Sequence, residues 1–221
     1  MHRLSGRHGS QGVDVLLPVA QGSWMPHLHL VIGPVGAGKS TFARQLSREH
    51  RAVRLTLDAW MARLFGRDER PAVGRLEWYV ERRDRCLEQI WELTKELVDV
   101  GTNVVLEIGL IQRSERERFY AQVDEMGYGL TVYVLDAPRE LRWERVQRRN
   151  EEKGNTFSME VPPYFFELAS NMWEPPDEDE CFERDVRFTR GREGVSPDSL
   201  QVSSSSISPS PRRCPRSRSR G

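Results

Sequence analysis

Short apolar segments alternate along the chain with longer segments whose apolar residues recur at helical spacing. Runs typical of buried strands occupy 27–33, 52–58, 104–108, 130–136 and, more briefly, 185–188. Helical spacing or helix-start signals mark the segments 39–50, 75–100, 114–126 and 138–150. A strand that is apolar along most of its length is buried on both faces, as in parallel sheets. The alternation therefore predicts an α/β fold, with a parallel sheet covered by helices on both faces.

The first predicted strand runs directly into Gly33-Pro-Val-Gly-Ala-Gly-Lys-Ser40, which matches G-x-x-x-x-G-K-[ST] in full. Glycines let the backbone form a nest of N–H donors around phosphates, while Lys39 reaches the β and γ oxygens and Ser40 offers a hydroxyl to Mg²⁺. The helix predicted to follow adds the positive end of its dipole. We expect the loop and the start of this helix to contact the nucleotide through Gly33, Pro34, Val35, Gly36, Ala37, Gly38, Lys39, Ser40 and Thr41.

Asp58 lies at the carboxyl end of the second predicted strand. Ligands of open α/β sheets bind outside the carboxyl ends of their strands, so this carboxylate is placed to accept the proton of a substrate hydroxyl. It also precedes a helical run and is a candidate helix cap, and the two roles are compatible. Arg63, one turn further, is a candidate for binding an anionic group of the substrate, with a solvated helix position as the alternative.

Glu107 lies in the apolar run Val104-Val-Leu-Glu107 of the third predicted strand. An acid in such a run is costly to bury without a partner, which favours a functional role. We expect Glu107 to hold the water shell of Mg²⁺, together with Ser40, or to position the substrate.

An arginine-rich helix is predicted after the fourth strand. Arg142, Arg145 and Arg149 share one helical face, and the polar stretch 151–155 follows them. Arginines on such a short helical lid can neutralise charge on a transferred phosphoryl group, and Arg145 and Arg149 are the candidates for this catalytic role. The alternative is an ordinary charged face that Glu140 and Glu144 balance.

Charge divides the 221 residues into unlike parts, although 33 basic and 33 acidic residues cancel overall. Residues 191–221 hold six arginines, two acids, and many Ser and Pro residues, and such a segment is expected to be disordered. Residues 1–26 are predicted to be a second disordered extension, which leaves 27–190 as one mildly acidic domain. Extended nucleic-acid binding by this domain is therefore not expected.

Three features of the sequence bear on cellular location: its apolar segments, its N-terminus and its cysteines. No window of about 20 apolar residues and no good signal peptide occurs, so no membrane association is expected. The three cysteines are far apart and form no C-x-x-C pair, which favours reduced thiols over a disulfide framework or a zinc site. These features predict a cytoplasmic protein.

The loop 33–40, then Leu-Thr-Leu-Asp58 with a following arginine, then Arg145-x-x-x-Arg149-Asn150, resemble small ATP-dependent kinases of the AAA_33 type. These kinases are cousins of polynucleotide 5′-hydroxyl kinases, chloramphenicol phosphotransferases and zeta toxins. The resemblance implies a P-loop NTPase fold with a five-stranded parallel sheet. It also implies that Lys39 and Ser40 bind ATP–Mg²⁺, that Asp58 is the general base, and that Arg145 or Arg149 acts from the lid. Glu107 stands where the polynucleotide kinases have an aspartate.

Three functions remain open at this point. The first is a kinase that moves the γ-phosphate of ATP to a hydroxyl of a small molecule or nucleotide, with Mg²⁺ as cofactor. The second is a regulatory P-loop ATPase that switches a partner. The third is a toxin-type kinase of a nucleotide sugar. The pattern identifies neither the acceptor nor the oligomeric state.

Overall fold

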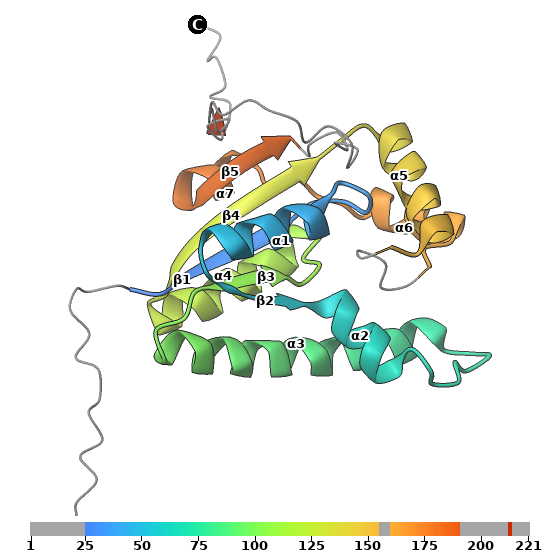
Figure 1. The fold of residues 1–221 in the computed structure, drawn as a ribbon, viewed down its shortest axis with the longest axis horizontal. Helices are drawn as coiled ribbons and strands as arrows, with labels where there is room; N and C mark the ends of the chain where they lie inside the picture. The colour runs from blue at the N-terminus through green and yellow to red at the C-terminus, as the bar shows by residue number, and fades with distance from the viewer. Residues whose placement is uncertain (1–24, 155–159, 191–211, 214–221) are drawn as a thin grey trace, which may run out of the picture.

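A twisted sheet runs through the computed structural model, which describes residues 25–154, 160–190 and 212–213 (Figure 1). The strand order is β2-β3-β1-β4-β5-β6, and the first five strands are parallel, which confirms the predicted five-stranded parallel sheet. The strands are β1 (His27–Ile32), β2 (Val53–Thr56), β3 (Val104–Glu107), β4 (Gly129–Asp136), β5 (Asp185–Arg190) and β6 (Arg212–Arg213). The two-residue strand β6 lies antiparallel to β5, and the sequence pattern does not predict this strand.

The central strand β1 is buried on both faces. Leu28, Leu30 and Ile32 belong to the core cluster on one face, and Val31 belongs to the cluster on the other. All four are at most 1% exposed. The burial explains why this strand is an apolar run rather than an alternating one, since alternation would leave one face to solvent.

Helices cover both faces of the sheet, as expected (Figure 1). Helix α1 (Lys39–Glu49) packs on one face through Ala43 and Leu46. Helices α3 (Arg75–Asp99) and α4 (Arg113–Met126) cover the other face, and α2 (Leu57–Phe65) contacts α3. Helices α5 (Arg139–Glu152) and α6 (Pro163–Asn171) lie at the end of the sheet where β1 runs into α1, and α7 (Glu178–Glu183) precedes β5.

The connections after β1 and β3 leave the sheet toward opposite faces. The chain passes from β1 into α1 on one face, and from β3 into α4 on the other. Neighbouring strands whose connections diverge in this way leave a crevice at their carboxyl ends, where ligands of open α/β sheets bind. The topology therefore places the glycine-rich loop beside Glu107, the last residue of β3.

Helix α4 begins one residue earlier than the sequence pattern predicts. Its N-cap is Gln112, and Glu115 closes the capping box by accepting from the backbone N–H groups of Ile111 and Gln112 at 3.1 and 3.2 Å. Ser114 and Glu117 also have the spacing of a capping box, but Ser114 already lies inside the first turn of α4. Gln112 with Glu115 and Ser114 with Glu117 have the same spacing of three residues, so the spacing alone does not show at which residue the helix begins.

Other expectations have mixed outcomes. Within the described part of the chain, no helix has the length and apolar composition needed to span a bilayer. Cys86 is buried and free, whereas Cys181 is disulfide-bonded, so the expectation of reduced thiols is wrong at Cys181. The predicted extensions 1–26 and 191–221 lie almost entirely outside the described residues.

Candidate active site

The glycine-rich loop between β1 and α1 depends on its glycines for physical reasons. Gly33 has φ of 145°, and a Cβ there would lie 2.1 Å from the carbonyl oxygen of Leu135 on β4. Gly36 has φ of 82°, and its Cβ would lie 2.5 Å from the carbonyl oxygen of Arg142 on α5. Any larger residue would push the loop away from both elements. The loop is thus held between β4 and α5 in one conformation.

The start of α1 is left open to an anion. Its N-cap Gly38 is left-handed, no side chain caps the helix, and its first turn contains no acid. The first amides of an uncapped helix lack intrahelical acceptors and bind phosphate well. Six of the nine predicted contact residues line the cavity here, namely Val35, Gly36, Gly38, Lys39, Ser40 and Thr41. The other three support the loop from behind: Gly33 and Pro34 bind Lys39 through their carbonyls, and Ala37 is fully buried.

Lys39 is held ready beneath the loop. Its Nζ donates to the carbonyl oxygens of Gly33 and Pro34 at 2.8 and 2.9 Å. Burial lowers its pKa, and the carboxylates of Glu107 and Asp58 oppose that shift. Among the residues that the structure describes, this ammonium has no anionic partner at bonding distance. The residues therefore suit a bound polyphosphate, which would supply that partner.

Ser40, Glu107 and Arg54 form a polar chain beside Lys39. The Ser40 hydroxyl donates to Oε1 of Glu107, and Arg54 on β2 pairs with Oε2 at 3.2 Å. Glu107 is 6% exposed, and burial raises its pKa although Ser40 and Lys39 oppose the shift. A hydroxyl next to a carboxylate is the oxygen donor set that Mg²⁺ prefers, with water and phosphate filling the remaining positions. The pair expected to hold Mg²⁺ is therefore brought together.

Asp58 lines the same cavity, but from a helix rather than a strand. Strand β2 ends at Thr56, which is the N-cap of α2, and Asp58 is the second residue of that helix. The cap alternative for Asp58 is therefore wrong. The backbone turns into α2 two residues earlier than predicted, and the Asp58 side chain is exposed on the first turn of this helix.

Tyr79 of α3 also lines the cavity. Burial raises the pKa of its hydroxyl to about 12, with a further contribution from Asp58. A neutral phenol in this place can donate a hydrogen bond at any physiological pH. The sequence gives no local signal for Tyr79, because it lies in an ordinary helical segment 21 positions after Asp58.

The arginines of α5 divide into two kinds. Arg145 and Arg149 line the cavity, as predicted, and so does Arg148. The Nε of Arg149 is buried without a hydrogen-bond partner among the described residues. Burial lowers the pKa of Arg149, while Asp58 and Glu107 act in the opposite direction. Arg149 is therefore a desolvated cation directed at the acids of the site.

Arg142 instead supports the loop. It donates to the carbonyl oxygens of Ala137 and Val35 and to the Ser170 hydroxyl, each at 3.0 Å. These bonds join α5, the glycine-rich loop and α6. Arg63, by contrast, is exposed on α2 and does not line the cavity, so the structure does not bring it to the site.

The cavity that these residues enclose measures about 410 Å³. Pockets of a few hundred cubic ångströms suit small ligands. The loop and α1 form one wall, Arg145 to Glu152 of α5 a second, and Asp58, Tyr79 and Ile111 a third. At the end of the α5 wall, the Asn150 side chain forms two hydrogen bonds with the backbone of Val161. Its Oδ1 accepts from the Val161 N–H at 3.2 Å, and its Nδ2 donates to the Val161 carbonyl at 2.9 Å.

These features define a P-loop NTPase of kinase-like architecture: a parallel sheet, a glycine-rich loop that carries Lys39 and Ser40, and Glu107 at the end of the neighbouring strand. The AAA_33 family model, described as an AAA domain, matches residues 28–162. The chain belongs to this family, which confirms the resemblance seen in its motifs.

Solved structures share the fold. A chain of the Pnkp1/Rnl/Hen1 RNA repair complex is 24% identical with a TM-score of 0.51, over 67% of this chain and 44% of that one. This protein thus spans less than half the length of that relative. A gluconokinase from Sinorhizobium meliloti is 16% identical, with a TM-score of 0.51 over 77% and 85% of the two chains.

A third similar structure is Kti12 from Chaetomium thermophilum in complex with ADP-AlF3. It is 15% identical, with a TM-score of 0.56 over 74% of this chain and 88% of that chain. A search of the curated proteins found no match. Identities at this level show a common fold, so the chemistry has to be argued from the site.

Proposed function

We propose that the protein is an ATP-dependent phosphotransferase that moves the γ-phosphate of ATP to a hydroxyl of a small molecule or nucleotide. The observation that carries this proposal is that Asp58 lines the same cavity as the phosphate loop and Arg149. A carboxylate facing the phosphate site is what a kinase needs to take a proton from its acceptor.

The loop side of the cavity would hold the triphosphate. The open amides at the start of α1 and the Lys39 ammonium supply donors for phosphate oxygens. Ser40 and Glu107 would hold Mg²⁺ directly or through water, and the ion would neutralise charge between the β- and γ-phosphates. Arg54 keeps the Glu107 carboxylate in place through its ion pair.

Asp58 would act as the general base. Its carboxylate accepts the proton of the acceptor hydroxyl as that oxygen bonds to the γ-phosphorus. The bond from the γ-phosphorus to the β–γ bridging oxygen breaks, and ADP leaves with the bonding electrons. Tyr79, which stays protonated, would donate a hydrogen bond to the acceptor on the same wall.

Arg149 would stabilise the phosphoryl group during transfer. It is half-buried, its Nε has no partner among the described residues, and the acids nearest to it electrostatically are Asp58 and Glu107. A desolvated, positioned cation stabilises developing negative charge strongly, because no solvent has to reorganise. Arg145 lines the cavity as well and would assist from the preceding turn.

The test is transfer of radiolabelled γ-phosphate to a panel of hydroxyl acceptors: nucleosides, oligonucleotide 5′-ends, sugars, nucleotide sugars, and aminocyclitol or phenicol antibiotics. We expect label in at least one acceptor class. Release of inorganic phosphate without dependence on any acceptor would instead indicate the regulatory ATPase. Transfer to a nucleotide sugar would indicate the toxin-type kinase.

The base assignment is tested by Asp58→Asn, which should abolish transfer and leave ATP binding intact. Asp179→Asn is a matched control, because Asp179 is also the second residue of a helix, α7, and lies outside the cavity. Full transfer activity in Asp58→Asn would show that Asp58 is not the base.

A further inference from the structure

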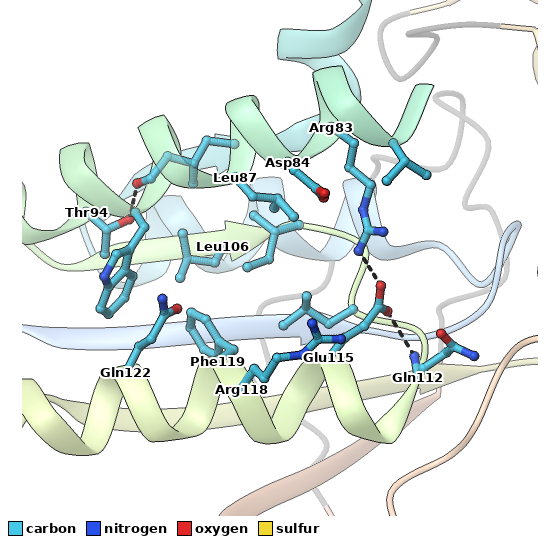
Figure 2. Close-up of a pocket in the computed structure, with 15 residues that line it drawn as sticks. Arg83, Asp84, Leu87, Thr94, Leu106, Gln112, Glu115, Arg118, Phe119 and Gln122 are labelled. Atoms are coloured by element: carbon cyan, nitrogen blue, oxygen red, sulfur yellow. Dashed lines mark hydrogen bonds and ion pairs between the residues drawn. The ribbon is translucent and has the colours of Figure 1, made fainter. Parts of the chain in front are cut away.

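A second cavity lies between α3 and α4, over β3 (Figure 2). We call it the α3–α4 groove. It measures about 420 Å³ and shares no lining residue with the nucleotide cavity. The two cavities are neighbours across the segment 108–111. Ile108 and Leu110 line the groove, whereas Gly109 and Ile111 line the nucleotide cavity.

The floor of the groove is apolar and partly aromatic. Leu106 of β3 is fully buried there, and Trp91 and Phe119 meet edge-to-face, with ring centroids 5.7 Å apart. Leu87 and Trp91 are only half-buried, so they leave apolar surface accessible within the groove. Such a floor suits an aliphatic or aromatic group, which gains free energy on leaving water.

One pair of charges at the rim is already used within the protein. Arg83 of α3 pairs with Oε1 of Glu115 on α4, and Oε2 of Glu115 accepts from the N–H groups of Ile111 and Gln112 (Figure 2). This carboxylate therefore closes one end of the groove and is not available to a ligand.

A second pair of charges at the rim is not used. Asp84 of α3 and Arg118 of α4 line the groove from opposite helices (Figure 2). In the described part of the chain, Asp84 has no hydrogen bond or ion pair, and the terminal nitrogens of Arg118 have none. The Nε of Arg118 donates to the Ser114 carbonyl at 3.1 Å, which anchors its guanidinium. The two charges do not reach each other across the opening.

We propose that the α3–α4 groove is a second ligand site, which binds a small zwitterion with an apolar body, of the chemical class of an apolar α-amino acid. The ligand ammonium pairs with Asp84, its carboxylate pairs with Arg118, and its side chain lies on the floor near Leu87 and Phe119. A ligand of a single charge satisfies only one wall of the groove. The site is separate from the nucleotide cavity and does not depend on the proposed phosphotransfer.

The test is isothermal titration calorimetry of the full-length chain with L-leucine, L-phenylalanine and L-tryptophan. We expect saturable binding of at least one of them. For that ligand, the analogue without its carboxylate and the analogue without its amine should each bind about tenfold more weakly, because each loses one charged hydrogen bond. For L-phenylalanine these analogues are 2-phenylethylamine and 3-phenylpropionate. Absence of saturable binding for all three amino acids, or analogues that both bind as tightly as the parent amino acid, would overturn the proposal.

Variants locate the site. Asp84→Asn and Arg118→Gln should each weaken binding about tenfold, while Glu88→Gln on α3 and Arg48→Gln on α1 are matched controls that lie outside the groove. All four positions are exposed, so we expect unchanged folding by circular dichroism. Lys39→Ala should bind the zwitterion like the wild-type protein. Loss of binding in that variant, or unchanged binding in both groove variants, would contradict the assignment.

Discussion

The nucleotide cavity and the α3–α4 groove are almost equal in volume and share one wall, but they are built in opposite ways. In the nucleotide cavity, buried and half-buried charged groups converge: Lys39, Glu107 and Arg149 all have pKa values that desolvation shifts. In the groove, the floor is apolar and the charged groups stay at the exposed rim. Volume alone therefore does not distinguish a site of chemistry from a site of binding, whereas the burial of charge does.

The largest expected effect comes from removing the charge at the centre of the nucleotide cavity. Lys39→Ala should weaken ATP binding and lower kcat about a thousandfold, because a desolvated cation facing the phosphates is lost. Steady-state phosphotransfer and ATP titration measure the two effects. Retained tight binding of ATP would show that the loop amides suffice without the lysine.

Arg149→Gln should have the next largest effect. We expect kcat to fall about a hundredfold with a small change in ATP affinity, since the guanidinium acts mainly on the charge of the transferred group. Arg148→Gln is a matched control from the adjacent position, where the side chain is exposed at the cavity rim. Equal losses in both variants would show that the charge of α5, rather than Arg149 itself, matters.

Glu115→Gln examines the wall that both cavities share. The substitution removes the ion pair with Arg83 and weakens the bonds to the Ile111 and Gln112 amides, which should lower the free energy of unfolding by about 1 kcal/mol. Chemical denaturation measures the loss. If Ile111 is displaced, KM for the acceptor should rise while ATP affinity is kept, and an unchanged KM would show that this wall is rigid without Glu115.

The smallest expected effect is in the groove floor. Thr94 is fully buried, and its hydroxyl donates to the Ile90 carbonyl at 2.7 Å. Thr94→Val keeps the shape and removes this bond, which should cost about 1 kcal/mol of stability and leave phosphotransfer unchanged. Thermal denaturation together with the transfer assay checks both parts. A loss of transfer larger than twofold would show that the floor acts on the nucleotide cavity.

The contrast between the cavities also explains what could be predicted from the sequence. The loop 33–40 and Glu107 carry local signals, namely a fixed spacing and an acid in an apolar run, so their places were predicted correctly. Asp58 lies beside the phosphate loop, as the sequence predicts, but on α2 rather than at the end of β2, because β2 passes into α2 without a loop and no spacing marks that turn.

Other residues left no local signal. Arg54 and Tyr79 reach the site only through strand order and the position of α3, which depend on contacts distant in sequence. The groove was not predicted because Leu87, Ile90 and Thr94 lie on the same helical stripe as ordinary core residues. Helical periodicity shows which side of a helix faces inward, but not whether the neighbouring helix fills the space.

Two hydrogen bonds join the side-chain amide of Asn150 to the backbone of Val161, and they have a consequence for protein engineering. Because one amide binds both the N–H and the C=O of Val161, the chain leaves α5 and returns to α6 at a fixed point. Arg149 precedes this point in the chain and Phe165 follows it, and both residues line the cavity. For protein engineering, Asn150 is therefore a residue to keep when acceptor preference is varied, because its hydrogen bonds hold together the two elements that carry Arg149 and Phe165.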